Sequence, residues 1–125
     1  MRWADMEPEW LNPTISRRLA VGEREMLGFI WLKKGAIVPA HKHVSEQITF
    51  ILKGALKFTI DGTDYTVKSG EVLIIPSNVV HEAIALDDTE DFDCFSPLRR
   101  DWLSGKDLYL RTGRSYLKRL PRGSH

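Results

Sequence analysis

The sequence has a single cysteine, no long apolar segment and almost no net charge. Cys94 alone cannot form an intramolecular disulfide, and such scarcity is typical of a reducing compartment, so we expect a cytoplasmic protein. No apolar run approaches the roughly 20 residues that a membrane-spanning helix needs. The first residues, among them Arg2 and Asp5, lack the apolar core of a signal peptide. We therefore expect no membrane partner.

The balance of charges argues against another class of partner. The 125 residues include 18 Lys and Arg against 17 Asp and Glu, a formal net charge of +1. A nucleic-acid-binding surface needs an excess of positive charge to neutralise phosphates, so we predict no nucleic acid partner. Hydrophobic residues make up 42% of the chain and charged residues 28%, which is ordinary for a globular protein. The length corresponds to one domain.

Histidine is also scarce, and its distribution is the most informative feature of the chain. His41, His43 and His81 lie in the body of the sequence, whereas His125 is the last residue. His41 and His43 are two positions apart, so their side chains point the same way on an extended segment. Gln47 and His81 can join them only if later strands return to the same place, as in a closed barrel. Three imidazoles and an amide oxygen suit a divalent first-row metal. The predicted metal ligands are His41, His43, Gln47 and His81.

Short β-rich segments recur between turn residues, and long helical periodicity is missing. Asp61-Gly62 is a strong hairpin signal. A short helix is expected near residues 98–103, followed by an uncertain tail from Leu108, and an acidic loop is expected at residues 87–91. Regularly spaced short strands predict an all-β sandwich or barrel. The predicted strands lie at residues 26–32, 36–39, 47–52, 55–60, 65–67, 72–75, 79–86 and 92–95.

The two ends of the chain do not share this strand pattern. Near the N-terminus, Trp3 and Trp10 are scattered in irregular polar sequence, and we expect this arm to pack on the barrel or on a partner subunit. Because exposed aromatic patches often mark interfaces, we predict a homodimer. The last six residues look like the remains of a protease site and an affinity tag, which removes His125 from the site. The predicted division into N-terminal arm, barrel, C-terminal extension and tag remnant is 1–25, 26–96, 97–119 and 120–125.

Glycines and prolines stand at fixed offsets from the histidines. The first block reads Gly35-x5-His41-x-His43-x3-Gln47-x6-Gly54, and the second reads Gly70-x5-Pro76-x4-His81. In both blocks the chain resembles the cupin superfamily, with Gln47 where glutamate is commoner, Asn78 at a glycine position and Ala85 at an asparagine position. The resemblance implies an all-β, single-domain cupin, a double-stranded β-helix (jelly-roll barrel) that holds one divalent metal ion. Zn, Ni, Mn or Fe could each serve. Cupins carry many activities, so this match decides little about function.

Gln47 has a consequence for the charge of the site. Three neutral imidazoles and a neutral amide leave the full charge of a divalent ion uncompensated. Inside a low-dielectric barrel this favours an anionic ligand, so we expect a small carboxylate-bearing substrate. The alternative is that Gln47 is a tolerated variant or does not bind the metal.

The last predicted strand carries an unusual acid. On an extended strand Asp93 and Phe95 share a face, and an aspartate among apolar neighbours is uncommon there. If that face points inward, Asp93 is a buried carboxylate near the metal and a candidate general acid or base. Arg99 then lies near the mouth, where its planar fork suits a carboxylate. The alternative is that Asp93 faces solvent and Arg99 pairs with Asp101 on the surface.

The stretch from Asp93 to Leu103 also resembles the C-terminal motif of the KdgF-type pectin and alginate degradation cupins, although Arg100 replaces a commonly acidic residue. The resemblance implies that Asp93 and Arg99 are catalytic and that Phe95 and Arg99 contact the substrate. The implied reaction converts a 4,5-unsaturated uronate monosaccharide to its linear keto form by ring opening and tautomerisation. A metal-dependent dioxygenase of a small enol or diketone, and a non-catalytic cupin that binds a small anion, are the alternatives.

Overall fold

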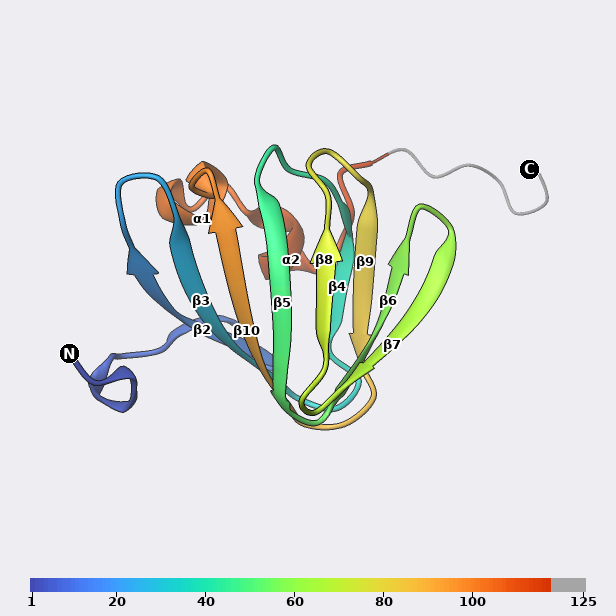
Figure 1. Ribbon diagram of the computed structural model, residues 1–125, viewed down its shortest axis with the longest axis horizontal. Helices are drawn as coiled ribbons and strands as arrows, with labels where there is room; N and C mark the ends of the chain where they lie inside the picture. The colour runs from blue at the N-terminus through green and yellow to red at the C-terminus, as the bar shows by residue number, and fades with distance from the viewer. Residues whose placement is uncertain (118–125) are drawn as a thin grey trace.

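Two antiparallel sheets form the body of the computed structural model, which describes residues 1–117. The larger sheet has the spatial order β1 (Glu9–Asn12), β2 (Ile15–Val21), β3 (Met26–Leu32), β10 (Thr89–Ser96), β5 (Glu46–Lys53) and β8 (Val72–Ile75). The smaller sheet has the order β4 (Ile37–His41), β9 (His81–Ala85), β6 (Ala55–Ile60) and β7 (Thr63–Lys68). The helical elements are η1 (Trp3–Asp5), α1 (Arg100–Ser104) and α2 (Leu108–Thr112). The predicted all-β jelly-roll fold is confirmed (Figure 1).

The inside of the barrel contains a group of buried polar side chains beside an apolar core. Strands β5 and β10 pair so that Phe95 lies opposite Gln47, Asp93 opposite Thr49 and Asp91 opposite Ile51. These side chains are buried because alternate residues of a strand face the same side. An apolar cluster from both sheets fills the remaining interior and includes Ile30, Leu32, Leu56 and Phe58.

The hairpin predicted at Asp61-Gly62 is confirmed and joins β6 to β7. Both residues have positive φ, 48° and 82°, as the central positions of a type I′ turn require. Gly54 has a second constraint, since its φ is +90° and an added Cβ would lie 2.4 Å from the carbonyl oxygen of Asp88. The end of β5 can therefore approach the loop before β10 only with glycine at this position.

The predicted acidic loop at residues 87–91 is wrong in its second half, because β10 begins at Thr89. Thr89 and Asp91 are buried inward-facing residues, and the Thr89 hydroxyl donates a hydrogen bond to the carbonyl of Asp87. Polar residues at inward positions hide a strand from a search for apolar alternation. The short remaining loop lies at the end of the barrel opposite α1 (Figure 1), so it does not cover that mouth.

The N-terminal arm contains two strands that the sequence pattern did not predict. β2 pairs with β3 from Ile15 opposite Leu32 to Val21 opposite Met26, which extends the larger sheet. The indole of Trp3 stacks on Phe92 with ring centroids 5.3 Å apart. The arm thus packs on the barrel of its own chain, and a homodimer stays a prediction.

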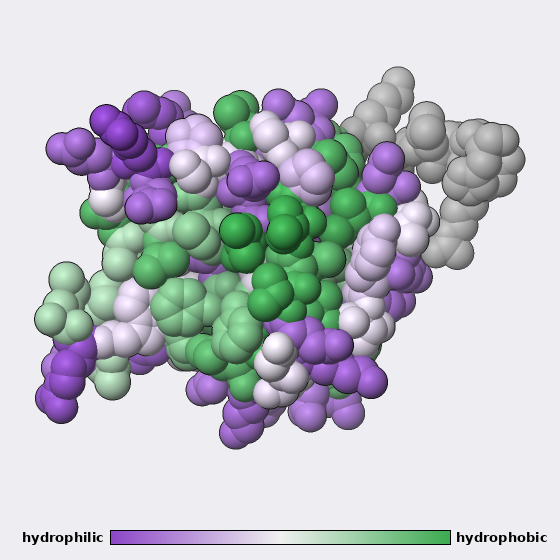
Figure 2. Space-filling model, viewed as in Figure 1, coloured by the Kyte–Doolittle hydropathy of each residue, from purple (hydrophilic) through white to green (hydrophobic). Residues whose placement is uncertain are grey.

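The outer face of the larger sheet remains strongly apolar. Ile48 and Phe50 of β5 lie opposite Ile74 and Val72 of β8, and these four side chains are 42%, 37%, 59% and 56% exposed. Figure 2 shows the apolar surface over these strands as one continuous region. Contiguous apolar patches of this kind are uncommon on monomers. No helix among residues 1–117 is long and apolar enough to cross a membrane.

The C-terminal segment forms a cap on the barrel end that carries the histidines. α1 matches the short helix expected near residues 98–103, and α2 lies within the tail that had no clear pattern. Trp102, Tyr109 and Leu110 are buried and belong to the main apolar cluster. The N-terminal hairpin holds this cap, because Arg17 of β2 forms a buried ion pair with Asp107. The predicted tag remnant at 120–125 and residues 118–119 lie outside the described residues.

Candidate metal centre

Three histidines converge inside the capped end of the barrel. His41 ends β4 and His81 begins β9, and the two residues face each other in the sheet register. His43 follows in the connection to β5. One ring nitrogen from each histidine lies within 4.8 Å of the others. The structure therefore brings together the three histidines that the sequence spacing predicts as ligands.

Backbone carbonyl groups set the orientation of all three rings. The Nδ1 atoms of His41, His43 and His81 lie 2.8, 2.8 and 2.9 Å from carbonyl oxygens two residues away in the chain. A carbonyl only accepts hydrogen bonds, so Nδ1 carries the proton and Nε2 keeps its lone pair. The Nε2 atom of His81 is buried and has no hydrogen-bond partner among residues 1–117. A buried lone pair of this kind fits a metal ligand.

Burial also keeps the histidines neutral. Desolvation is the main cause that lowers their pKa values, and neighbouring positive charge, including the guanidinium of Arg99, adds to it. The pKa of His41 lies well below its usual value, and that of His43 falls to about 4. At neutral pH a metal ion therefore displaces no protons from these rings.

Gln47 completes the donor set through a chain of hydrogen bonds. The hydroxyl of Thr49 donates to Asp93 at 2.7 Å and accepts a bond from the amide nitrogen of Gln47 at 2.8 Å. This directs the amide oxygen of Gln47 to His43 Nε2, at 3.1 Å. Because His43 carries its proton on Nδ1, the lone pair of its Nε2 faces a lone pair of the Gln47 amide oxygen. A cation bound between these two atoms would remove their repulsion. The geometry fits Gln47 as a fourth ligand.

The donor set as a whole fits a divalent first-row ion. Imidazole nitrogens suit Zn, Ni and Fe, and the amide oxygen adds a hard donor that Mn also accepts. All four groups are neutral, so an ion at this position keeps its charge for an anionic ligand. Which ion occupies the site stays a prediction.

Strand β10 carries two carboxyl groups inside the barrel, near the histidines. Asp91 and Asp93 both face inward and are about 4% exposed. Burial is the main cause that raises the pKa of Asp93, and it holds the pKa of Asp91 well above the usual range, reinforced by the charge of Asp93. One oxygen of Asp91 has no hydrogen-bond partner among the described residues. Two adjacent buried carboxyl groups cannot both ionise at low cost, so the pair holds a proton to higher pH than an isolated carboxyl group would.

Arg99 combines features of both sequence-based alternatives. Its side chain is 2% exposed and lies over the rings of Phe95 and Trp102, at 5.1 and 4.8 Å from their centroids. It also pairs with Asp101, whose oxygens accept from Nε at 3.0 Å and from Nη2 at 2.9 Å. The pairing with Asp101 agrees with the surface alternative, whereas the burial of Arg99 and Asp93 agrees with the pocket.

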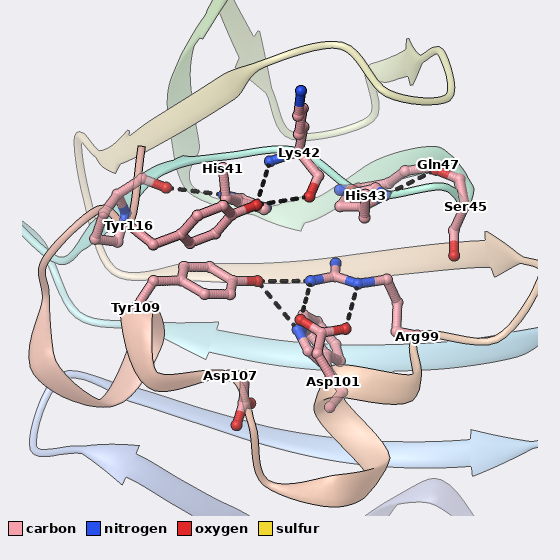
Figure 3. A network of polar contacts seen from close by, with 12 residues as sticks. His41, Lys42, His43, Ser45, Gln47, Arg99, Asp101, Asp107, Tyr109 and Tyr116 are labelled. Atoms are coloured by element: carbon pink, nitrogen blue, oxygen red, sulfur yellow. Dashed lines mark hydrogen bonds and ion pairs between the residues drawn. The ribbon is translucent and has the colours of Figure 1, made fainter. Parts of the chain in front are cut away.

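Tyr109 joins Arg99 to the histidines (Figure 3). Its hydroxyl accepts hydrogen bonds from Arg99 Nη2 at 2.6 Å and from the indole of Trp102 at 3.2 Å. Its ring stacks on His41 with centroids 4.4 Å apart. A second tyrosine, Tyr116, accepts from the Lys42 amide at 3.1 Å and donates to the Lys42 carbonyl at 2.9 Å. The C-terminal cap is thus fastened to the loop that carries the histidines.

The space around the site is divided into an interior cavity and two outer grooves. The interior cavity measures about 40 Å³ and is lined by His41, Gln47, Asp93, Phe95 and Arg99, among others. The outer grooves measure about 480 and 360 Å³. Both are bordered by His43 and Asp101, and Arg99 borders only the smaller of the two. Asp101 therefore stands between solvent and the pocket.

Sequence reasoning missed three residues of this site. Thr49 has the same parity as Gln47 on β5, and that parity was the available signal. Asp91 was hidden by its assignment to a loop. Tyr109 had no signal in the sequence, because its contact with His41 depends on how the cap folds back over the barrel.

Comparison with known proteins agrees with this architecture. The chain matches the model of the cupin domain over residues 28–96. No curated protein matches it. The solved structure of KdgF from Halomonas sp. is similar with 26% identity and a TM-score of 0.76, covering 81% of this chain and 96% of that one. An RmlC-like cupin from Shewanella frigidimarina is 25% identical with a TM-score of 0.77, covering 82% and 93%.

A more distant structure supports the fold alone. A predicted oxalate decarboxylase from Thermotoga maritima is 20% identical with a TM-score of 0.69, covering 78% of this chain and 97% of that one. The matched domain model spans both histidine blocks and the strands that carry them. With the three histidines at its capped end, this chain belongs to the cupin family.

Proposed function

We propose that this cupin binds one divalent metal ion and converts a 4,5-unsaturated uronate monosaccharide to its linear keto form. The observation that carries the proposal is the position of Arg99, a buried guanidinium beside the cluster of three histidines and on the same pocket as Asp93. The motif Asp93-x-Phe95-x3-Arg99 resembles that of the KdgF-type cupins. The similarity to KdgF from Halomonas sp. over most of both chains supports the same proposal.

The reaction is an isomerisation and needs no redox partner. The anomeric hydroxyl loses its proton and the ring oxygen takes one up as the bond between C1 and the ring oxygen breaks, which leaves an aldehyde at C1 and an enol at C4–C5. C4 then takes up a proton while the enol oxygen loses one, and C5 becomes a ketone. The net change moves one proton from the anomeric hydroxyl to C4.

The residues of the pocket can divide this work. The guanidinium of Arg99 binds the substrate carboxylate, and the ring of Phe95 forms the wall beneath it. Asp93 exchanges the proton, because it is a buried carboxyl group that lines the same cavity as Arg99 and burial raises its pKa. Asp91 keeps a proton available to Asp93. A bound metal ion supplies a Lewis acid that polarises the substrate oxygens.

The test is a spectroscopic assay under nitrogen. Metal-loaded protein is added to unsaturated galacturonate freshly made with a lyase, and the conjugated double bond is followed by ultraviolet absorbance. We expect decay much faster than the spontaneous rate with the unmodified protein and with Asp64→Asn, an exposed control on β7. Arg99→Met should remove the acceleration. No acceleration with Zn, Ni, Mn or Fe would overturn this function, and a parallel oxygen electrode would reveal a dioxygenase.

A further inference from the structure

We infer that Asp101 occupies the fork of Arg99 in place of the substrate and is exchanged for the substrate carboxylate on binding. Asp101 is then a specificity-determining residue, because only a ligand that brings its own carboxylate can replace it. The inference rests on the proposed function in one respect: it takes the ligand of Arg99 to be a carboxylate.

The donors of Arg99 are divided so that a second carboxylate cannot make a two-bond contact. Asp101 takes Nε and one hydrogen of Nη2, at 3.0 and 2.9 Å. The hydroxyl of Tyr109 takes the other hydrogen of Nη2, at 2.6 Å. Nη1 has no hydrogen-bond partner among residues 1–117, but alone it offers only a single nitrogen. A bidentate contact, which is the strong form of this pair, therefore requires Asp101 to leave.

The two partners differ in their freedom to move. Arg99 is 2% exposed and is held by Tyr109 and by the rings of Phe95 and Trp102. The side chain of Asp101 is 34% exposed and borders both outer grooves. Asp101 is therefore the partner that can turn towards water, which would break its contacts with Arg99 and with the backbone N–H of Trp102. In the larger groove it would lie near Lys106, which lines the same space.

Exchange also avoids the main cost of freeing a buried arginine. A buried guanidinium without a partner is strongly destabilising. When one carboxylate replaces another, Arg99 stays neutralised throughout. A neutral sugar offers no such replacement, so binding it by the same route would leave the charge uncompensated. The pocket thus discriminates acidic sugars from neutral ones.

The cavities give the path of the ligand. The interior cavity of about 40 Å³ is far smaller than the roughly 300 Å³ at which small-molecule pockets begin. A ligand therefore enters through the outer grooves, which measure about 480 and 360 Å³ and are bordered by His43, and only its reacting end extends towards the cavity lined by Asp93 and Phe95. Asp101 and His43 border both grooves, and Arg99 borders the smaller one, so rotation of Asp101 would free space beside Arg99.

The experiment measures binding rather than turnover. Metal-loaded protein is titrated with D-galacturonate, a stable uronate, and with D-galactose as the neutral analogue, by isothermal titration calorimetry. Because Asp101→Asn removes the internal competitor, galacturonate should bind about tenfold more tightly than to the unmodified protein. Asp64→Asn should leave its affinity unchanged, Arg99→Met should abolish the preference over galactose, and Asp101→Ser serves if the first variant does not fold.

Three results would overturn the exchange. Unchanged affinity in Asp101→Asn would mean that the carboxylate binds without displacing Asp101. Weaker affinity would mean that Asp101 only positions Arg99. If neither the unmodified protein nor Asp101→Asn bound galacturonate, the ligand assumed for Arg99 would be wrong. The test is separate from that of the proposed function, since tighter binding with no ring opening would leave the exchange intact and refute only the reaction.

Discussion

Two buried arginines, Arg17 and Arg99, lie over the same ring of Trp102, at 4.7 and 4.8 Å from its centroid. All three nitrogens of Arg17 have partners: Nε bonds to Glu9 at 2.8 Å, Nη1 pairs with Asp107, and Nη2 donates to the Trp102 carbonyl at 3.2 Å. Arg99 instead leaves Nη1 without a partner among residues 1–117. The two guanidiniums thus share an aromatic support but differ in how completely they are bonded.

Arg17 pairs with a fully buried acid, Asp107, besides the half-exposed Glu9, whereas the acid paired with Arg99 is the partly exposed Asp101. The side chain of Asp107 is 0% exposed, whereas that of Asp101 is 34% exposed. A pair closed to water on both sides has no route for exchanging a partner, and it fastens the C-terminal cap to the N-terminal hairpin. A pair open on the acid's side can exchange its acid for another. Burial of the acid, more than burial of the arginine, is thus what distinguishes the Arg17–Asp107 pair from the Arg99–Asp101 pair.

The largest effect is expected from breaking the closed pair, the buried ion pair between Arg17 and Asp107. Arg17→Met leaves the carboxylate of Asp107 buried with only Arg111 as a partner, and such losses cost about 3–5 kcal/mol of unfolding free energy. Urea unfolding followed by circular dichroism would measure it. At temperatures where the variant is folded, the affinity for galacturonate should change little. A loss below about 1 kcal/mol would contradict the structural role of this pair.

The second-largest effect is expected from breaking the open pair, Arg99 and Asp101, and it is a loss of catalytic activity. Arg99→Met should lower kcat/KM for the unsaturated uronate by about 100-fold or more, the usual consequence of losing one charged contact to the reacting substrate. Its unfolding free energy should fall less than that of Arg17→Met, because the freed Asp101 can turn to water. Kinetics and urea unfolding on the same preparations give both values. A reversed order of the two stabilities would refute the comparison.

The sequence predicted the part of this site that depends on local spacing. Strands β3, β6 and β8 occupy the apolar segments expected between turn residues, and the histidine spacing identified the three histidines that lie close together in the structure. β2 was missed because a buried Arg17 interrupts such an apolar segment, and its partner Asp107 is 90 residues away. The exchange of Asp101 for a ligand could not be predicted either, since it depends on the relative exposure of two side chains and on Tyr109.

A third prediction concerns a buried acid that has another acid, rather than an arginine, beside it. The pKa of Asp91 is raised in the folded protein by burial and by Asp93. Above the ordinary carboxyl pKa the unfolded chain ionises Asp91 while the folded chain keeps it protonated, so this residue costs stability that grows as pH rises. Asp91→Asn removes the cost, which is absent in strong acid.

The gain in unfolding free energy from Asp91→Asn should therefore be roughly 1–2 kcal/mol larger at pH 7 than at pH 4. Urea unfolding of both proteins across this range would measure it. The exposed variant Asp64→Asn controls for the loss of one carboxyl group from the surface. A difference that stays constant with pH would mean that Asp91 ionises as readily in the folded protein as in the unfolded chain.

The smallest effect is expected from changing the acid of the open pair, Asp101. Asp101→Asn should lower the unfolding free energy less than Asp107→Asn does, because the group it replaces is 34% exposed rather than fully buried and its amide oxygen can still accept from Arg99. Asp107→Asn, the same change in the closed pair, should cost several times more. Parallel urea titrations of the two variants compare the same chemical change at two exposures. Equal losses would show that both pairs are structural, and the exchange inferred for Asp101 would then lose its physical basis.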